Sequence, residues 1–469
     1  MMKRILLFFA VMFMGAGLCC AQNSAGRFAG DWNGVLVLGG QSIKMEFAIG
    51  EENGVAVGKM AAQGVKDIPV EVLVHGDSLQ LQVKQLNMSY EGLLLGRNIM
   101  GTFSQNGFTA AMMLLPGKLE VVRPQTPKAP FPYKTEEVTF SNAAEGAILS
   151  GTLTYPVGYG GMNKSDVPVV VMVTGSGLQN RDEEIFDHKP FAVIADWLAR
   201  NGIASLRYDD RGTGGSSNPV EGATSENNAR DAKAAVEYLR SLGEFGKVGI
   251  LGHSEGGTIA FMLAGEKVPD FIISLAGVAT AGVDCIVWQN VAALELRGVP
   301  QQMAQDYGKA LRGLYAERVR RFRENVSGGD DKARVEGGAI PRAKEFVHQL
   351  CAEEGLKLPP QFVENLIIVA STVSPWLDWF VAYDPADAIR NIKCPVMAVN
   401  GTLDMQVPVE NLELLGRLLE NDSRNLIKEY PSLNHLFQPC TKATSLQYGE
   451  IEQTISPQVL EDIVKWIKN

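Results

Sequence analysis

The spacing of hydrophobic and polar residues changes along the chain near residue 124. Before that point, short runs such as Lys-Met-Glu-Phe-Ala-Ile at 44–49 alternate apolar and polar positions, and Gly, Asn and Asp separate the runs. A period of two with frequent turn residues is typical of antiparallel strands that bury one face. The pattern therefore predicts an antiparallel β-domain over residues 22–123, either a small barrel or a sandwich.

Three aromatic residues of this segment, Trp32, Phe47 and Tyr90, could line a ligand cavity. However, the interiors of small barrels are commonly filled by large side chains of this kind. We therefore interpret the three aromatic residues as core.

Residues 124–134 contain four prolines and are predicted to be an interdomain linker, because proline cannot donate a backbone hydrogen bond or continue a helix. After the linker, continuous apolar runs alternate with amphipathic helical segments. Such runs are typical of a parallel sheet covered by helices on both faces. We predict an α/β domain over residues 135–469, with strands at 168–173, 203–208, 248–251, 271–275 and 396–399.

More than a hundred residues separate the predicted strand that ends near Ala276 from the one that begins near Cys394. A plain strand–helix–strand crossover needs roughly 30 residues. We therefore predict a helical cap inserted at about residues 282–380. Its charged segment at 315–323 is interpreted as a solvated helix face.

The charge balance limits the possible partners. The 469-residue chain has a formal net charge of −10 and no block of basic residues that could neutralise phosphates, which argues against nucleic acid. Residues 208–216, Tyr-Asp-Asp-Arg-Gly-Thr-Gly-Gly-Ser, lack the Lys-Ser/Thr of a P-loop and the spacing of a dinucleotide motif. We interpret them as a structural turn beside the site.

The first 21 residues have the pattern of an export signal, with a basic start, an apolar core at 5–14 and Ala21 before the expected cleavage point. The apolar core is too short for a membrane span, and no other stretch is long and apolar enough for one. We expect an exported protein, periplasmic or extracellular. Lipid attachment through Cys19 or Cys20 stays open as an alternative.

Four cysteines follow the expected cleavage point. In an oxidising compartment they could pair in three full combinations, which the sequence does not separate. The chain contains no Cys-x-x-Cys pair and no His/Cys cluster, so we predict no metal. The four are Cys285, Cys351, Cys394 and Cys440.

Candidate chemistry is concentrated in residues 250–257, Ile-Leu-Gly-His-Ser-Glu-Gly-Gly, between an apolar run and a helix-like segment. The spacing of Gly252, Ser254 and Gly256 is typical of a nucleophile elbow, a tight strand-to-helix turn that exposes a serine hydroxyl at the edge of a sheet. The glycines matter because side chains two residues before and after the strained serine would collide. We predict Ser254 as the nucleophile.

A serine nucleophile needs a general base, and in this architecture the acid and then the histidine follow the serine along the chain. Of five histidines, only His435 lies in a late loop, between the last predicted strand and a terminal helix. His253 adjoins the serine, but its side chain is expected on the wrong side of the turn. Asp404 follows the strand at 394–399 and is predicted to orient His435.

Two backbone N–H groups are expected to stabilise the oxyanion of a tetrahedral intermediate. One belongs to Glu255, directly after the nucleophile. The other is expected from the loop at 174–178, with Ser176 as first choice and Gly177 as alternative. Gln179 and Arg181, which follow this loop, could contact substrate or belong to a solvated charge cluster.

With these motifs, residues 135–469 resemble the α/β-hydrolase family, and most of all secreted bacterial esterases. In those esterases Gly-Ser-Gly-x-Gln-x-Arg-Asp follows the third strand and Arg-Gly-x-Gly-x-Ser follows the fourth, as at 175–182 and 211–216 here. The resemblance implies an α/β-hydrolase fold, a small N-terminal β-domain and ester hydrolysis through an acyl-enzyme. The relatives commonly have His where this chain has Thr174, which bears on the oxyanion loop and not on the triad.

We therefore expect a serine carboxylic ester hydrolase that acts on small or short-chain acyl esters without a cofactor. Two alternatives stay open. One is a peptidase of the aminopeptidase type that uses the same triad, and the other is a non-catalytic envelope binding protein in which the β-domain acts.

Overall fold

The computed structural model describes residues 24–38, 41–62, 65–118, 122–218, 221–327 and 335–469. The expected signal peptide, residues 1–21, lies outside the described residues. The chain divides into two compact units. The first runs to Val122 and includes Ile185–Asp187, and the second comprises Arg123–Glu184 and His188–Asn469.

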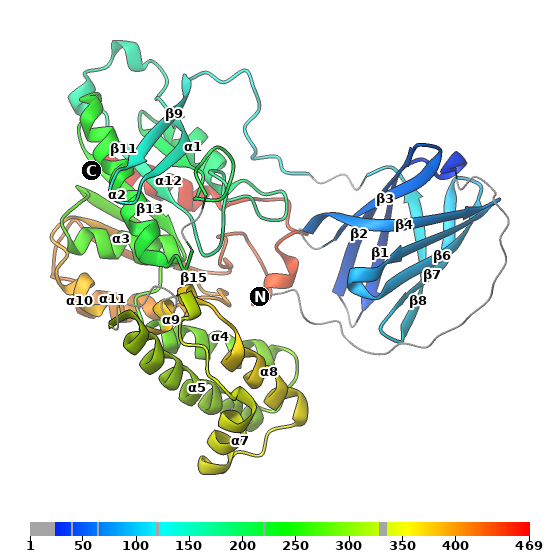
Figure 1. Cartoon of the computed structure of the whole chain (residues 1–469). Helices are drawn as coiled ribbons and strands as arrows, with labels where there is room; N and C mark the ends of the chain where they lie inside the picture. Colours follow the sequence, from blue (N-terminus) through cyan, green and yellow to red (C-terminus); the bar gives the residue numbers. More distant parts are fainter. Residues whose placement is uncertain (1–23, 39–40, 63–64, 119–121, 219–220, 328–334) are drawn as a thin grey trace. The chain divides into compact units, whose positions relative to one another are not determined.

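The N-terminal unit is a closed barrel in which each strand pairs antiparallel with the next and β1 pairs with β8 (Figure 1). The predicted antiparallel β-domain is confirmed, in its barrel form. Its strands are β1 (Gly30–Leu38), β2 (Gln41–Glu52), β3 (Val55–Ala62), β4 (Val65–His75), β5 (Ser78–Val83), β6 (Met88–Leu95), β7 (Asn98–Gln105) and β8 (Phe108–Pro116).

Aromatic side chains fill the barrel interior. Trp32, Phe47 and Tyr90 are 5%, 1% and 0% exposed and pack in one apolar cluster, as the core interpretation expects. The Tyr90 hydroxyl lies 3.0 Å from the carbonyl oxygen of Ile99, to which it donates. Two paired glycines leave room for this ring, because a Cβ atom at Gly101 would lie 2.6 Å from the Tyr90 hydroxyl oxygen.

The second unit is built on a mixed sheet of order β16-β15-β14-β13-β11-β12-β10-β9. Strand β10 runs antiparallel to both its neighbours, and the other adjacent strands are parallel. This order is that of the α/β-hydrolase fold, as predicted. The strands are β9 (Thr135–Asn142), β10 (Ala147–Thr154), β11 (Val169–Val173), β12 (Ala204–Tyr208), β13 (Val248–His253), β14 (Phe271–Leu275), β15 (Val396–Gly401) and β16 (Leu426–Tyr430).

Helices cover both faces of the sheet because the central strands are apolar on both sides. On one face, Phe191 and Ile194 of α1 (Pro190–Arg200) pack with Ile463 of α12 (Pro457–Lys468) in one cluster. On the other face, a second cluster contains side chains of four helices. These are α2 (Ser225–Leu242), α3 (Glu255–Gly265), α11 (Asn411–Leu418) and the short α10 (Ala386–Arg390), which packs against α3.

A group of helices is inserted between β14 and β15 and packs around its own apolar core (green to yellow in Figure 1). These helices form the cap. They are α4 (Gly282–Leu296), α5 (Gln301–Ser327), α7 (Ala343–Glu353), α8 (Pro360–Ser371) and α9 (Pro375–Ala382).

The charged segment at 315–323 is not simply a solvated helix face, which corrects the sequence interpretation. Arg318 of α5 is 0% exposed, and its Nε donates to Oδ1 of the equally buried Asp378 on α9 at 2.7 Å. The same guanidinium donates to the carbonyl oxygen of Val369 at 2.7 Å. Only part of the segment, such as Arg320 with its ion pairs, faces solvent. Arg318 therefore joins three segments of the cap.

Among the described residues, no single helix has the length and apolarity to cross a membrane, and α8 with α9 meet that test only as a pair bent by 99°.

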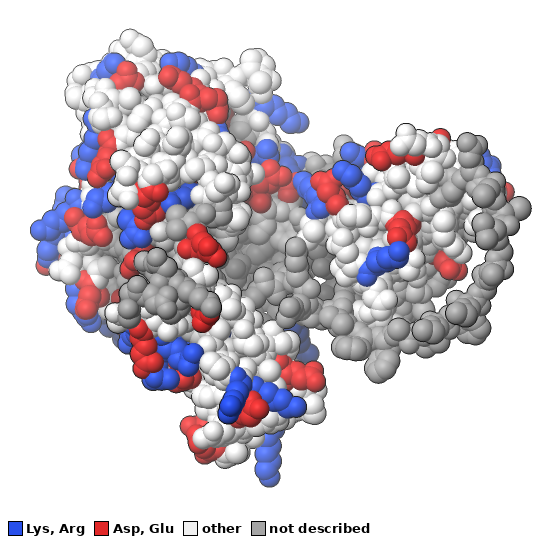
Figure 2. All heavy atoms as spheres, in the orientation of Figure 1, with Lys and Arg blue, Asp and Glu red and all other residues white. Residues whose placement is uncertain are grey.

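The four cysteines after residue 21 are free thiols, so no disulfide links the described parts of the chain. Basic and acidic side chains are interspersed on the visible face (Figure 2).

Candidate active site

Ser254 lies on a sharp turn between β13 and α3. Its φ of 54° and ψ of −118° are values that residues with a side chain rarely adopt. A Cβ atom at Gly252 would lie 2.0 Å from the carbonyl oxygen of Gly256, and a Cβ atom at Gly256 would lie 2.0 Å from that of Val173. The turn therefore needs glycine at both positions, for the steric reason expected of an elbow.

Asp404 and His435 form a buried hydrogen bond at the carboxyl edge of the sheet. Oδ2 of Asp404 lies 2.8 Å from Nδ1 of His435, and the two side chains are 0% and 3% exposed. Oδ1 of Asp404 accepts the N–H groups of Gln406 and Val407 at 2.7 and 2.9 Å. These donors hold the carboxylate in place. His435 is thereby oriented with Nδ1 as donor and Nε2 as the free nitrogen.

Ser254 and His435 lie at the same edge of the sheet, because His253, the neighbour of Ser254 in the chain, contacts His435. The imidazole rings of His253 and His435 have centroids 4.7 Å apart, and Ser254 directly follows His253. The hydrogen bonds of the described residues include none between Ser254 Oγ and His435 Nε2. In free enzymes such bonds are often long and tighten only when substrate binds.

The loop at 174–178, the oxyanion loop, passes beside the nucleophile. A Cβ atom at Gly175 would lie 3.3 Å from Cβ of Ser254. The N–H of Gly175 donates to Glu183 at 2.7 Å, whereas no hydrogen bond of the described residues uses the N–H of Ser176 or Gly177. The first N–H groups of a helix have no partner within it. The N–H of Glu255, the first residue of α3, and that of Ser176 or Gly177 are therefore the available donors.

Asp210 holds the oxyanion loop in place through hydrogen bonds to Thr174 and Gln179. Its carboxylate accepts the Thr174 hydroxyl at 3.0 Å and the N–H of Gln179 at 2.9 Å, and its own N–H donates to the Gln179 carbonyl. Burial raises the pKa of Asp210 to about 7, against the effect of these hydrogen bonds. The side chain of Gln179 lies 3.4 Å from the carbonyl oxygen of Ser176. Thr174 thus serves as an anchor of the loop.

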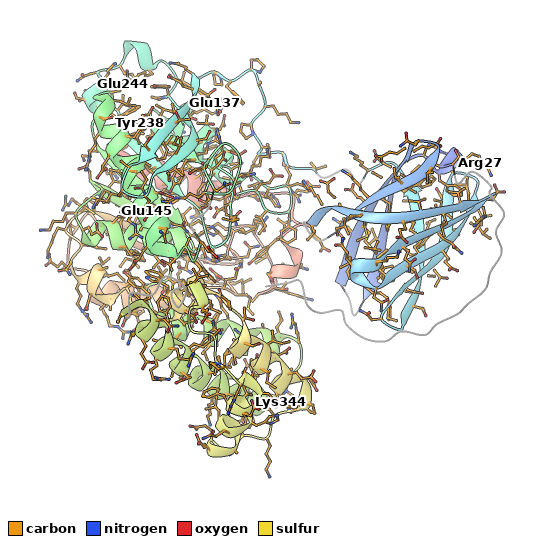
Figure 3. All side chains as sticks on the ribbon, in the orientation of Figure 1. Arg27, Glu137, Glu145, Tyr238, Glu244 and Lys344 are labelled. Atoms are coloured by element: carbon orange, nitrogen blue, oxygen red, sulfur yellow. The ribbon has the colours of Figure 1, made fainter. Side chains whose placement is uncertain are left out.

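Arg181 is engaged by protein groups rather than directed at a substrate. Its guanidinium pairs with Asp209 at 2.7 Å and also donates to Glu137 on β9 and to Ser150 and Thr152 on β10 (Glu137 is labelled in Figure 3). The structure therefore gives Arg181 the role of joining β9, β10 and the turn at 208–216. The turn at 208–216 therefore has a structural role beside the site, in line with its interpretation from the sequence.

Two residues near the site were missed or set aside on sequence grounds. His253 and Glu183 are 7% and 5% exposed, and they are joined by a 2.9 Å contact between Nδ1 and Oε1. The only sequence signal for Glu183 is its place directly after the Arg-Asp of the oxyanion loop motif.

The cap also reaches the elbow, because Nε1 of Trp376 donates to Oε2 of Glu255 at 2.9 Å. Burial raises the pKa of Glu255.

The described residues contain no cluster of metal ligands. No group of three or more His, Cys, Asp or Glu side chains in the described ranges could hold a metal ion. The acidic and imidazole groups at the edge of the sheet are instead paired with one another, as in Asp404 with His435 and Glu183 with His253.

The family whose sequence pattern this chain matches is X-Pro dipeptidyl-peptidase (S15 family), over residues 145–430, more than half of the chain. The chain belongs to this family. The S15 match includes Ser254 and Asp404 and ends before His435.

Individual relatives of this S15-family chain are distant. Esterase EstD of Thermotoga maritima is 23% identical over 320 residues, which are 68% of this chain and 65% of EstD, so the chain spans less than two thirds of that relative. Among solved structures, GrgF from Penicillium sp. sh18 is 16% identical with a TM-score of 0.42, covering 71% of this chain and 98% of GrgF. The Pyrococcus furiosus esterase Pf2001 is 14% identical with a TM-score of 0.41, covering 75% and 98%.

Proposed function

We propose that this S15-family chain is a serine carboxylic ester hydrolase for small or short-chain acyl esters. The observation that carries the proposal is the buried hydrogen bond between Asp404 and His435, beside an elbow with Ser254 at its strained apex. The similarity to EstD, an esterase, supports an ester as the bond cleaved.

In the proposed reaction, Ser254 Oγ attacks the ester carbonyl carbon while His435 Nε2 takes the hydroxyl proton. Asp404 holds the His435 tautomer and stabilises the imidazolium. The carbonyl π pair moves to oxygen, and this oxyanion accepts the N–H groups of Glu255 and the oxyanion loop. Collapse expels the alcohol with the proton from His435 and leaves an acyl-enzyme. Water then attacks the acyl carbon with His435 as base, and the carboxylic acid and free Ser254 are released.

The test is hydrolysis of p-nitrophenyl esters of increasing acyl length by the purified mature chain. We expect turnover that is highest with short acyl groups and that falls by about 10³- to 10⁶-fold in Ser254→Ala, because the covalent route is lost. Ser241→Ala is a matched control, since this exposed hydroxyl only donates to the carbonyl oxygen of Tyr238. Comparable turnover in wild type and Ser254→Ala would refute the assignment.

The family description favours a second candidate, a peptidase that uses the same three side chains. The acyl-enzyme chemistry would be the same, with an amine in place of the alcohol as leaving group. A higher kcat/KM for Ala-Pro-p-nitroanilide than for p-nitrophenyl acetate would select the peptidase. If neither substrate is turned over and a fluorophosphonate probe does not label Ser254, a non-catalytic binding protein is the better reading.

We propose in addition that the chain is exported, with cleavage after Ala21. The basic start and apolar core of residues 1–21 support this. Mass determination of the N-terminus of protein isolated from its native cells tests it, and an intact Met1 would refute it.

A further inference from the structure

The His253 ring makes two hydrogen bonds, and both of its partners are acceptors. Nδ1 lies 2.9 Å from Oε1 of Glu183, and Nε2 lies 3.0 Å from the backbone carbonyl oxygen of His435. A neutral imidazole has one donor and one acceptor nitrogen, so it cannot satisfy a carboxylate and a carbonyl oxygen together. An imidazolium donates from both nitrogens and fits both contacts.

Glu183 connects the same ring to the oxyanion loop. Its Oε1 accepts the N–H of Gly175 at 2.7 Å as well as the His253 contact. One oxygen of Glu183 thus contacts both the oxyanion loop and the His253 ring. Glu183 has a φ of 52°, in the left-handed region that is costly for a residue with a side chain. The backbone is held in this conformation where the carboxylate meets both partners.

The surroundings strengthen this ion pair. A small cavity beside the pair is otherwise lined by apolar side chains, namely Pro190, Phe191, Ile194, Leu275, Phe437 and Ile455 among others. Burial alone would lower the pKa of His253, but the Glu183 carboxylate, the His435 carbonyl and the more distant Asp404 raise it above its ordinary value. The charged groups that act on His253 are thus acidic, and the other ring beside it is that of His435.

We propose that Glu183 and His253 are positioning residues, a buried carboxylate–imidazolium pair that fixes the oxyanion loop and the His435 loop relative to Ser254. The inference rests on the proposed function, because it names what sets the distance between base, nucleophile and oxyanion donor. The pair reaches all three: Gly175 precedes the donor Ser176, His253 precedes Ser254, and the His435 carbonyl belongs to the base itself. Neither residue touches the reacting atoms.

The protonation state can be read without any substrate. The chain has five histidines, so ¹⁵N-histidine labelling of the full chain gives a small set of imidazole signals, and His253→Gln identifies the one of interest. We expect both His253 nitrogens to carry protons at neutral pH in the wild type. In Glu183→Gln the signal is expected to become that of a neutral ring. A neutral His253 in the wild type would overturn the proposal.

Kinetics test the positioning role. Glu183→Gln keeps the shape of the side chain and an acceptor for Gly175 but removes the charge. We expect kcat for p-nitrophenyl acetate to fall about 100-fold, as for a misplacement of about 1 Å at the reacting groups, with KM unchanged. Glu184→Gln makes the same chemical change one residue later, and we expect it to retain the wild-type kcat.

A double-mutant cycle separates the pair from two independent effects. We expect Glu183→Gln with His253→Gln to lose no more activity than either single change, because each one breaks the same unit. Additive losses, a wild-type kcat in Glu183→Gln, or a loss confined to KM would each overturn the proposal. Absence of any ester hydrolysis in the wild type would refute the proposed function instead, and the NMR result would still decide whether the ion pair exists.

Discussion

The barrel and the α/β unit fill their interiors with different chemistry. Among the described residues of the barrel, no acidic or basic side chain is buried, and Asn33 is the buried polar residue. In the α/β unit, acidic and basic side chains are buried on the sheet and in the cap. They are Glu183, His188, Asp209, Arg211, Asp231, His253, Glu255, Arg318, Asp378, Asp404 and His435.

Buried charges therefore lower stability in the α/β unit unless they are paired, whereas the described part of the barrel has no such cost. Burying a charged group is costly unless it is paired and hydrogen-bonded, and perturbed buried groups are concentrated at functional sites. Some of the buried groups in the α/β unit serve the site at the sheet edge, as in the Asp404–His435 and Glu183–His253 pairs. Others hold segments together, as in the Arg318–Asp378 pair of the cap. The barrel needs neither kind to close.

The largest effect is expected from a buried charge that acts on the chemistry. In Asp404→Asn the amide cannot hold His435 in the tautomer that accepts the serine proton, and we expect kcat to fall about 10⁴-fold. Ester turnover measures this, and circular dichroism checks that the fold is retained. Asp422→Asn, an acid that pairs with Arg424 on the surface, is the matched control and should keep full activity. A fall of less than tenfold in Asp404→Asn would contradict the role assigned to Asp404.

The next effect is expected from a buried charge with a structural role. Arg318→Ala leaves Asp378 buried and unpaired, which should cost about 3 to 5 kcal/mol in the free energy of unfolding. Urea unfolding measures the loss. Replacing both partners, as Arg318→Met with Asp378→Leu, should recover most of it because no unpaired charge remains. Equal destabilisation by the single and double changes would show that the pair is not the cause.

A third test uses pH. Because the folded-state pKa of Asp210 is raised to about 7, its stabilising contribution is full below the unfolded value, about 3.9, and is lost as the pH rises through 7. The wild type should therefore lose stability between pH 4 and pH 8 relative to Asp210→Asn, by on the order of 4 kcal/mol. Melting temperatures of both proteins across this range give the difference. Parallel curves would mean that Asp210 titrates normally.

The smallest effect is expected in the barrel. Tyr90→Phe removes one hydroxyl that donates to backbone carbonyls inside an apolar cluster, and the cost should be about 1 kcal/mol. Scanning calorimetry of the full chain measures this change, and ester turnover should stay at the wild-type level. A loss of turnover in Tyr90→Phe would show that the two interiors are not functionally separate.

Exposed apolar residues weaken the strand signal in the barrel. Strands β4, β6 and β8 each carry such residues on the outer side. Leu73, Leu93 and Met113 are 47%, 52% and 42% exposed, so the alternation of apolar with polar positions is incomplete in these strands. The period-two signal depends on a polar outer face. The parallel strands β11 to β15 were predicted because continuous apolar runs need no alternation, whereas β9 and β10, in the antiparallel part of the sheet, were not predicted.

The sequence by itself determined the division into a β-domain and an α/β domain, the elbow around Ser254, and the scarcity of histidines that singled out His435. These are properties of local spacing and chain order, which a linear pattern contains. Only the tertiary structure decided which side chains share a proton or a charge. His253 meets a glutamate 70 positions away and a carbonyl 182 positions away, because the sheet places β11 beside β13 and brings the loops after them to one edge. Arg181 and Arg318 found their acidic partners in the same way, across distances in sequence that no local pattern records.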